Sequence, residues 1–150
     1  MHQEHKNADP AFEYSRIAPQ VFIGTNACCQ GHFEQMLLKE GISADVSLEG
    51  EMVDHPYGVE TYLWLPTPDH EAPSAANVRI GAAALEAMLK DGKKVYIHCK
   101  NGHGRAPTFY AAYLILTEGI APEEAFARIQ EKRPLAHLEP SQAEFLRSLT

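Results

Sequence analysis

The stretch VYIHCKNGHGRAPT, residues 95–108, decides the fold because its character changes within a few residues. It begins with three residues, Val95 to Ile97, that are typical of a buried strand. A turn that contains two glycines follows, and the residues beyond Arg105 have the spacing of a helix. Cys99 lies at one end of this turn and Arg105 at the other, so a nucleophilic and a cationic side chain flank the same loop.

A strand, a glycine-rich turn and the start of a helix together form a site for an anion. The free backbone N–H groups of a helix N-terminus point toward the ligand, and the helix dipole favours negative charge there. Gly102 and Gly104 allow backbone angles that let successive amides converge. Arg105 supplies a planar set of donors that suits two phosphate oxygens. The same loop favours the thiolate of Cys99, which could attack the phosphorus of a bound phosphate in line.

Strands and helices alternate on both sides of this loop. The predicted strands cover residues 44–48, 59–65 and 93–98, and residues 17–23 are predicted to form a short strand or a hairpin. The predicted helices cover 31–40, 74–90, 105–118, a segment from Pro122 and a short C-terminal helix. Ser74 is a predicted N-cap, and Ser141 with Glu144 is a predicted capping box. We therefore predict an α/β fold with a mainly parallel central sheet of about four to five strands flanked by helices.

The chain has 150 residues, a formal net charge of −7 and 45% hydrophobic residues. This length suits one domain, which we place at residues 14–150 after a flexible tail at 1–13. The negative charge disfavours nucleic acid as a partner. No apolar run is long enough to span a membrane, and residues 1–10 lack the apolar core of a signal peptide. We expect a cytoplasmic monomer without stable membrane insertion.

The three cysteines are Cys28, Cys29 and Cys99. An odd number with one adjacent pair does not suit a disulfide framework and favours a reducing compartment. We interpret Cys28 and Cys29 as buried small residues. The alternative is that one of them forms a reversible disulfide with an oxidised Cys99.

Residues 98–105, HCKNGHGR, resemble the signature loop of the cysteine-dependent protein tyrosine phosphatases, in particular their small dual-specificity branch. The resemblance covers about residues 16–148. It implies that Cys99 forms a phosphocysteine intermediate and that the activity needs neither a cofactor nor a metal. It also implies a set of residues that bind the substrate phosphate, namely Lys100, Asn101, Gly102, His103, Gly104 and Arg105.

In this family an aspartate on an upstream loop protonates the leaving oxygen. The stretch LPTPDHEAPS, residues 65–74, resembles that loop and makes Asp69 the predicted general acid. A positioned acid contributes about 10²–10⁴-fold in rate. Asp54 and Glu71 remain alternative acids. Gln142 could correspond to a glutamine that positions water in parts of the superfamily, although we interpret it as an exposed helix residue.

Ala106 departs from the family pattern, because the residue after the arginine is usually serine or threonine. The hydroxyl of that residue assists the thiolate as a leaving group. Thr108 lies nearby in the sequence, but nothing shows that it compensates. We therefore predict that the phosphocysteine breaks down slowly.

These features predict a dual-specificity protein phosphatase that acts on a phosphorylated protein or a small phosphate ester. Positive charge at Lys100 and His103 leaves a phosphoinositide or other non-protein ester as an alternative, and Ala106 leaves a weakly active phosphate-binding pseudophosphatase. A rhodanese-type sulfur transferase would not explain Asp69. A metal site is disfavoured by the absence of a CxxC pair and an HExxH helix, although its imagined ligands would be Cys28, Cys29 and His32, or His98, Cys99 and His103.

Overall fold

The computed structural model describes residues 10–150. Most of the tail predicted at residues 1–13 therefore lies outside the described residues. Ala11 and Glu13, at its end, accept hydrogen bonds from Thr25 through their backbone carbonyl oxygens. The division into a tail and one domain stays a prediction.

A five-stranded sheet forms the centre of the molecule, with strand order β1-β2-β5-β3-β4. Only β1 is antiparallel to its neighbour, and the other pairs are parallel. The predicted α/β fold with a mainly parallel sheet is therefore confirmed. The strands are β1 (Tyr14–Ala18), β2 (Val21–Gly24), β3 (Ile42–Glu49), β4 (Thr61–Thr67) and β5 (Lys94–His98).

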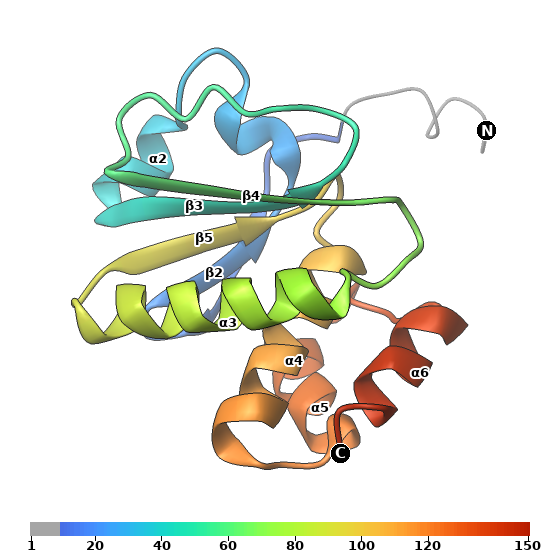
Figure 1. Cartoon of the computed structure of the whole chain (residues 1–150). Coiled ribbons are helices and arrows are strands. Elements are labelled where there is room, and N and C mark those ends of the chain that lie inside the picture. The colour runs from blue at the N-terminus through green and yellow to red at the C-terminus, as the bar shows by residue number, and fades with distance from the viewer. Residues whose placement is uncertain (1–9) are drawn as a thin grey trace, which may run out of the picture.

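Helices cover both faces of this sheet (Figure 1). One face carries α3, α4, α5 and α6, and the other carries α2 and a short 3-10 helix. Side chains that alternate along β5 serve the two cores, because Ile97 packs in the larger cluster and Tyr96 in the smaller one. The helices are the 3-10 helix (Asn26–Cys29), α2 (Gln35–Lys39), α3 (Ala75–Lys90), α4 (Arg105–Glu118), α5 (Pro122–Lys132) and α6 (Pro140–Arg147).

Local sequence signals explain most helix ends. The Ser74 side chain accepts a hydrogen bond from the Asn77 N–H and caps α3, as predicted. Gly119 ends α4 in the left-handed conformation, with φ of 69°. The predicted capping box of the last helix is wrong by two positions. Because Pro140 takes the first turn of α6, Glu139 is the N-cap and Gln142 completes the box.

Two elements differ from their predicted lengths. Helix α2 is shorter than the predicted 31–40, since Glu34 is extended and its N–H is bonded to the Cys28 carbonyl instead of an intrahelical partner. Strand β4 continues through Pro66 to Thr67, whereas the predicted strand ended at residue 65. Because β4 is an edge strand, the missing N–H of Pro66 costs no ladder hydrogen bond.

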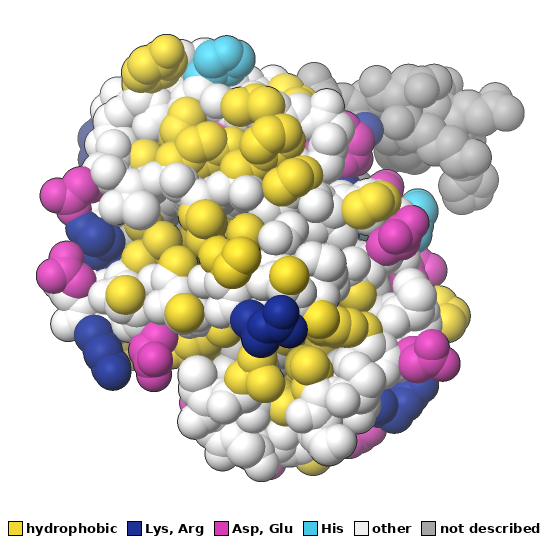
Figure 2. All heavy atoms as spheres, in the orientation of Figure 1, with side chains coloured by type: hydrophobic (Ala, Val, Ile, Leu, Met, Phe, Trp, Pro, Cys, Tyr) yellow, Lys and Arg dark blue, Asp and Glu magenta, His cyan; other side chains and the backbone are white. Residues whose placement is uncertain are grey.

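The surface that carries β4 and α3 is largely apolar at its centre (Figure 2). Lys and Arg side chains on this face are scattered among Asp and Glu rather than gathered into a basic patch. Among the described residues, no helix is both long enough and apolar enough to cross a membrane.

Candidate active site

The signature loop, residues 98–105, joins the end of β5 to the start of α4. Its conformation depends on glycine at position 102. Gly102 has φ of 71°, and a Cβ there would lie 2.5 Å from the carbonyl oxygen of Gly24. Gly24 ends the neighbouring parallel strand β2, opposite His98. The loop therefore folds back against β2 so closely that only glycine fits.

The loop forms the floor of a small pocket of about 100 Å³. The pocket brings together the three predicted catalytic residues Cys99, Arg105 and Asp69. Of the predicted phosphate-binding residues, Lys100 and Gly102 do not line it. Its lining consists of Asp69, His70, Cys99, Asn101, His103, Gly104, Arg105, His137, Glu139 and Gln142.

The sulfur of Cys99 lies at the N-terminus of α4. Cys99 is a free, buried cysteine, and its Sγ accepts a hydrogen bond of 3.5 Å from the Ala106 N–H. The sulfur therefore faces a backbone donor at the positive end of a helix. The Thr108 hydroxyl does not replace the missing hydroxyl at position 106, because it donates to the Gly104 carbonyl at 2.7 Å.

Arg105 is held by an acidic partner that the sequence did not indicate. Its guanidinium donates to the two carboxylate oxygens of Glu51, at 2.5 and 3.1 Å, and to the Thr67 carbonyl at 2.9 Å. Burial alone would lower the pKa of Arg105, but the hydrogen bond to Glu51 and nearby negative charges raise it. Burial would likewise raise the pKa of Glu51, and Arg105 lowers it instead. The pair is therefore charged, and the guanidinium is fixed before any ligand binds.

Asp69 lies on the loop that follows β4 and has a half-exposed side chain. Its Oδ1 accepts a hydrogen bond from the His70 N–H and lies 3.4 Å from Nη2 of Arg105. Among the described residues that line the pocket, neither alternative acid appears. Asp54 is buried beneath the loop and bonded to His98, and Glu71 lies beyond the pocket. The geometry thus favours Asp69 among the three candidate acids.

Gln142 is buried, so the interpretation as an exposed helix residue is wrong. Its Oε1 accepts the Glu139 N–H at 2.8 Å, and its Nε2 donates to the Glu71 carbonyl at 3.1 Å. A Cβ at Gly104 would lie 3.2 Å from both Nε2 and Oε1. Gln142 therefore fastens α6 to the Asp69 loop and also covers the signature loop. Its position two residues after Pro140, in the first turn of a helix, was the available signal.

Arg133 braces the signature loop from the opposite side. Its side chain is buried, and it donates to the carbonyl oxygens of Gly102, at 2.8 Å, and Asn101, at 3.0 Å. Two further hydrogen bonds reach the carboxylate of Glu13, at 2.8 and 2.7 Å. These bonds fix the turn from below. Burial, together with Arg133 and His137, lowers the pKa of His103, so the His103 ring adds little charge at neutral pH.

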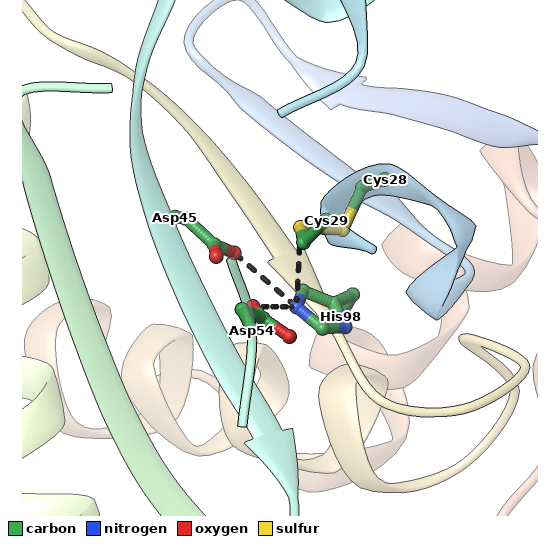
Figure 3. A group of neighbouring side chains, drawn as sticks. All are labelled: Cys28, Cys29, Asp45, Asp54 and His98. Carbon is green, nitrogen blue, oxygen red and sulfur yellow. Dashed lines mark hydrogen bonds and ion pairs between the residues drawn. A yellow bond between two sulfur atoms is a disulfide. The ribbon is translucent and has the colours of Figure 1, made fainter. Parts of the chain in front are cut away.

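His98 connects the loop to a buried acidic pair. Its Nε2 donates to Asp54 at 2.7 Å and lies 3.2 Å from Asp45, while its Nδ1 faces the Cys99 carbonyl at 3.2 Å (Figure 3). Burial alone would lower the pKa of His98, but the two carboxylates hold it well above its usual value. Burial raises the pKa of Asp45 to about 8. A charged imidazole therefore contacts the backbone of the nucleophile.

Cys28 and Cys29 are buried, as expected, but they form a disulfide with each other. The interpretation as buried small residues is therefore confirmed for their burial, but it did not include this bridge. An odd number of cysteines is evidence against a framework of bridges between distant segments. These two cysteines are instead neighbours that are joined within the 3-10 helix Asn26–Cys29. The alternative bridge to Cys99 is not formed, since Cys99 is free.

Comparison with known proteins identifies the family. Residues 21–150 match the family model described as dual specificity phosphatase, catalytic domain. Mouse dual specificity phosphatase 28 is 31% identical over 124 residues, which are 82% of this chain and 75% of the relative. Human phosphatidylglycerophosphatase and protein-tyrosine phosphatase 1 is 36% identical over 145 residues, covering 89% of this chain and 71% of the relative.

Solved structures of proteins from the same family resemble this chain. The crystal structure of human DUSP28 has a TM-score of 0.82 and 25% identity, and covers 95% of this chain and 96% of that one. The crystal structure of PTPMT1 has a TM-score of 0.76 and 29% identity, and covers 91% and 93% of the two chains. The resemblance drawn from residues 98–105 is confirmed. The chain belongs to the dual specificity phosphatase family and is a phosphatase of that type.

Proposed function

We propose that this chain hydrolyses phosphomonoesters through a phosphocysteine on Cys99, with Arg105 as the phosphate clamp and Asp69 as the general acid. The observation that carries the proposal is that these three side chains line one pocket although they come from separate segments. Two of them flank the turn between β5 and α4, and the third follows β4. A pocket of about 100 Å³ suits a phosphate group.

In the first step the Cys99 thiolate attacks phosphorus and the ester oxygen leaves. The S–P bond forms as the P–O bond breaks, and the Asp69 carboxylic acid gives its proton to the departing oxygen. Arg105 and the loop amides neutralise the equatorial oxygens. Because Glu51 already fixes the guanidinium, little reorganisation is needed in the transition state.

In the second step water attacks the phosphocysteine and restores the thiolate. The Asp69 carboxylate accepts the proton of the attacking water, and the S–P bond breaks. The Ala106 N–H, at 3.5 Å from Sγ, stabilises the departing sulfur. Gln142 lines the same pocket and is placed to orient the water, in addition to fastening α6.

Trapping the intermediate tests this proposal. The protein is mixed with a phosphorylated substrate, denatured within milliseconds and digested, and the peptides are analysed by mass spectrometry. We expect one phosphate on the peptide that contains Cys99 and none on peptides with other nucleophiles. Phosphate on a different residue, or turnover without a covalent intermediate, would refute the assigned role of Cys99.

Ala106→Ser should speed the second step. A hydroxyl at this position can donate to the departing sulfur, which in the wild type receives the Ala106 N–H. We expect the wild type to release a burst of p-nitrophenol close to one equivalent, and the variant to show a smaller burst with a steady rate about tenfold higher. Stopped-flow absorbance measures both quantities. The absence of a burst in the wild type would contradict slow breakdown of the intermediate.

Asp69→Asn should lower kcat/KM, which reports formation of the phosphocysteine, by about 10²-fold or more for phenyl phosphate, whose leaving group needs a proton. The amide cannot supply one, although it occupies the same space. The loss should shrink as the leaving group becomes more acidic along a series of aryl phosphates. Glu71→Gln is the matched control, because Glu71 lies outside the pocket. An equal loss of kcat/KM for every leaving group would show that Asp69 is not the general acid.

The substrate that we favour is a phosphorylated protein. We expect this chain to act on it in the cytoplasm and as a monomer. A second class, phosphate esters of lipids, is supported by the 36% identity to human phosphatidylglycerophosphatase and protein-tyrosine phosphatase 1. A structure of PTPMT1 in complex with PI(5)P, 27% identical, also resembles this chain with a TM-score of 0.75. Comparing kcat/KM for phosphotyrosine and phosphothreonine peptides, phosphoinositides and phosphatidylglycerophosphate decides between the classes.

A further inference from the structure

Five side chains with metal-ligating atoms gather in the core behind the signature loop. They are Cys28, Cys29, Asp45, Asp54 and His98, and we call them the buried cluster. All five are buried, and one ligand atom from each lies within 4.8 Å of the others. They come from the 3-10 helix, from β3, from the segment after β3 and from β5 (Figure 3). The mechanism proposed above uses none of them directly.

The carboxylate of Asp45 lacks a hydrogen-bond partner. Asp45 is fully buried, and among the described residues neither of its oxygens accepts a hydrogen bond. Oδ1 lies 3.2 Å from Nε2 of His98, but the hydrogen on that nitrogen is directed at Asp54, 2.7 Å away. The carboxylate points into the buried cluster (Figure 3). A buried polar group in this condition is unfavourable, and a bound cation would supply the missing partner.

The His98 ring already has the orientation of a metal ligand. Its Nε2 faces both carboxylates and lies 3.8 Å from Sγ of Cys29. Its other nitrogen, Nδ1, is 3.2 Å from the carbonyl oxygen of Cys99. A histidine that binds a metal commonly donates its second ring N–H to such a carbonyl, which fixes the tautomer and the ring. Nε2 is therefore the atom available to a cation.

The sulfurs are the part of the cluster that must change. In the Cys28–Cys29 disulfide they are bonded to each other, and the thiolate rather than the disulfide is the metal ligand. A dithiol reductant would break the Sγ–Sγ bond by supplying two electrons and two protons, and would itself become a disulfide. The product carries two thiols, of which Cys29 already faces His98.

We propose that reduction of the Cys28–Cys29 disulfide turns the buried cluster into a binding site for a divalent cation of the zinc class, with Cys29, His98, Asp45 and Asp54 as ligands. One thiolate, one imidazole and two carboxylates form a donor set that zinc accepts in tetrahedral geometry. The Cys29 thiol, Nε2 of His98 and the carboxyl of Asp45 release the protons that they carry to solvent when the cation binds. The site is distinct from the pocket that holds Cys99 and Arg105.

The required adjustment is small. Ligand atoms on a tetrahedral zinc with bonds of about 2.0 Å lie about 3.3 Å apart. Asp45 Oδ1 and His98 Nε2 are already 3.2 Å apart, while Asp54 Oδ2 and Nε2 must separate from 2.7 Å. Asp54 follows β3 and belongs to no strand or helix, so its backbone can shift without breaking the sheet.

Zinc titration of the whole chain in two redox states tests the proposal. One sample is reduced with a phosphine and desalted without oxygen, and the other is oxidised with diamide. Zinc affinity is measured by competition with a chromophoric chelator. We expect about one zinc per reduced chain and at least about 100-fold weaker binding in the oxidised chain. The absence of zinc in the reduced chain, or equal binding in both states, would overturn the proposal.

Variants locate the bound ion. Asp45→Asn keeps the shape of the side chain and should weaken zinc binding at least about tenfold. With cobalt(II) as a spectroscopic probe, Cys29→Ser should remove the thiolate-to-metal charge-transfer band. Cys99→Ser and His70→Gln are the controls and should retain the zinc. Loss of zinc in either control would place the ion in the active-site pocket and refute the proposal, and the comparison of redox states decides the matter if Cys29→Ser does not fold.

Discussion

Replacing Cys99 with serine should lower kcat/KM for p-nitrophenyl phosphate by at least about 10⁴-fold. The serine hydroxyl is not ionised near neutral pH, so it cannot replace a thiolate as the attacking group. The rest of the anion site is unchanged, because Arg105 is held by Glu51 and not by the sulfur. The variant should therefore lose turnover and keep its affinity for the phosphate ester. Initial rates measure the first quantity, and calorimetric titration with a phosphopeptide measures the second.

The thermal stability of Cys99→Ser distinguishes lost chemistry from lost folding. Sγ accepts one hydrogen bond, from the Ala106 N–H, and a serine oxygen can accept it as well. The melting temperature of the variant should therefore stay close to that of the wild type. Bound phosphopeptide should raise the melting temperature of the variant. Activity within tenfold of the wild type would mean that another group attacks phosphorus. A variant that is inactive and no longer binds the ester would mean that Cys99 shapes the site instead.

The elements next to the signature loop could be predicted well from sequence because their signals are local. Helix α4 has the predicted bounds 105–118, and β5 begins one residue after the predicted start. A glycine turn, a capping serine at Ser74 and apolar periodicity act within a few residues. Helix α2 was predicted too long because the Glu34 N–H is bonded to the Cys28 carbonyl, and periodicity does not report such a contact.

The charged residues around the signature loop could not be predicted, because contacts with distant segments rather than local sequence decide their partners. Glu51 follows β3 without any motif, yet it fixes Arg105. Arg133 ends α5, where a cation usually faces solvent, yet it holds the carbonyl oxygens of the signature loop. Asp45 is fully buried in β3, although an aspartate usually faces solvent. A single sequence does not distinguish an acidic or basic residue that faces solvent from one that contacts a distant side chain.

Arg105→Lys should lower kcat/KM by about 10³-fold while the chain stays folded. The wild-type guanidinium contacts Glu51 with two nitrogens and still faces the pocket. A lysine ammonium is a point charge on a flexible stem, so it cannot hold Glu51 and two phosphate oxygens at once. Both kcat and KM should worsen, because the guanidinium binds the phosphate in the ground state and more strongly in the transition state. Steady-state kinetics with one phosphopeptide measures the two effects.

Arg128→Lys is the matched control for this substitution. Arg128 pairs with Glu118 and Glu124 on an exposed face, away from the residues that line the pocket, so activity should not change. Glu51→Gln gives the complementary test. It keeps Arg105 but weakens its anchor, and should reduce kcat by about tenfold, less than Arg105→Lys does. If Arg105→Lys retained more than a tenth of the wild-type kcat/KM, a positive charge alone would suffice, and the fork held by Glu51 would not be the phosphate clamp.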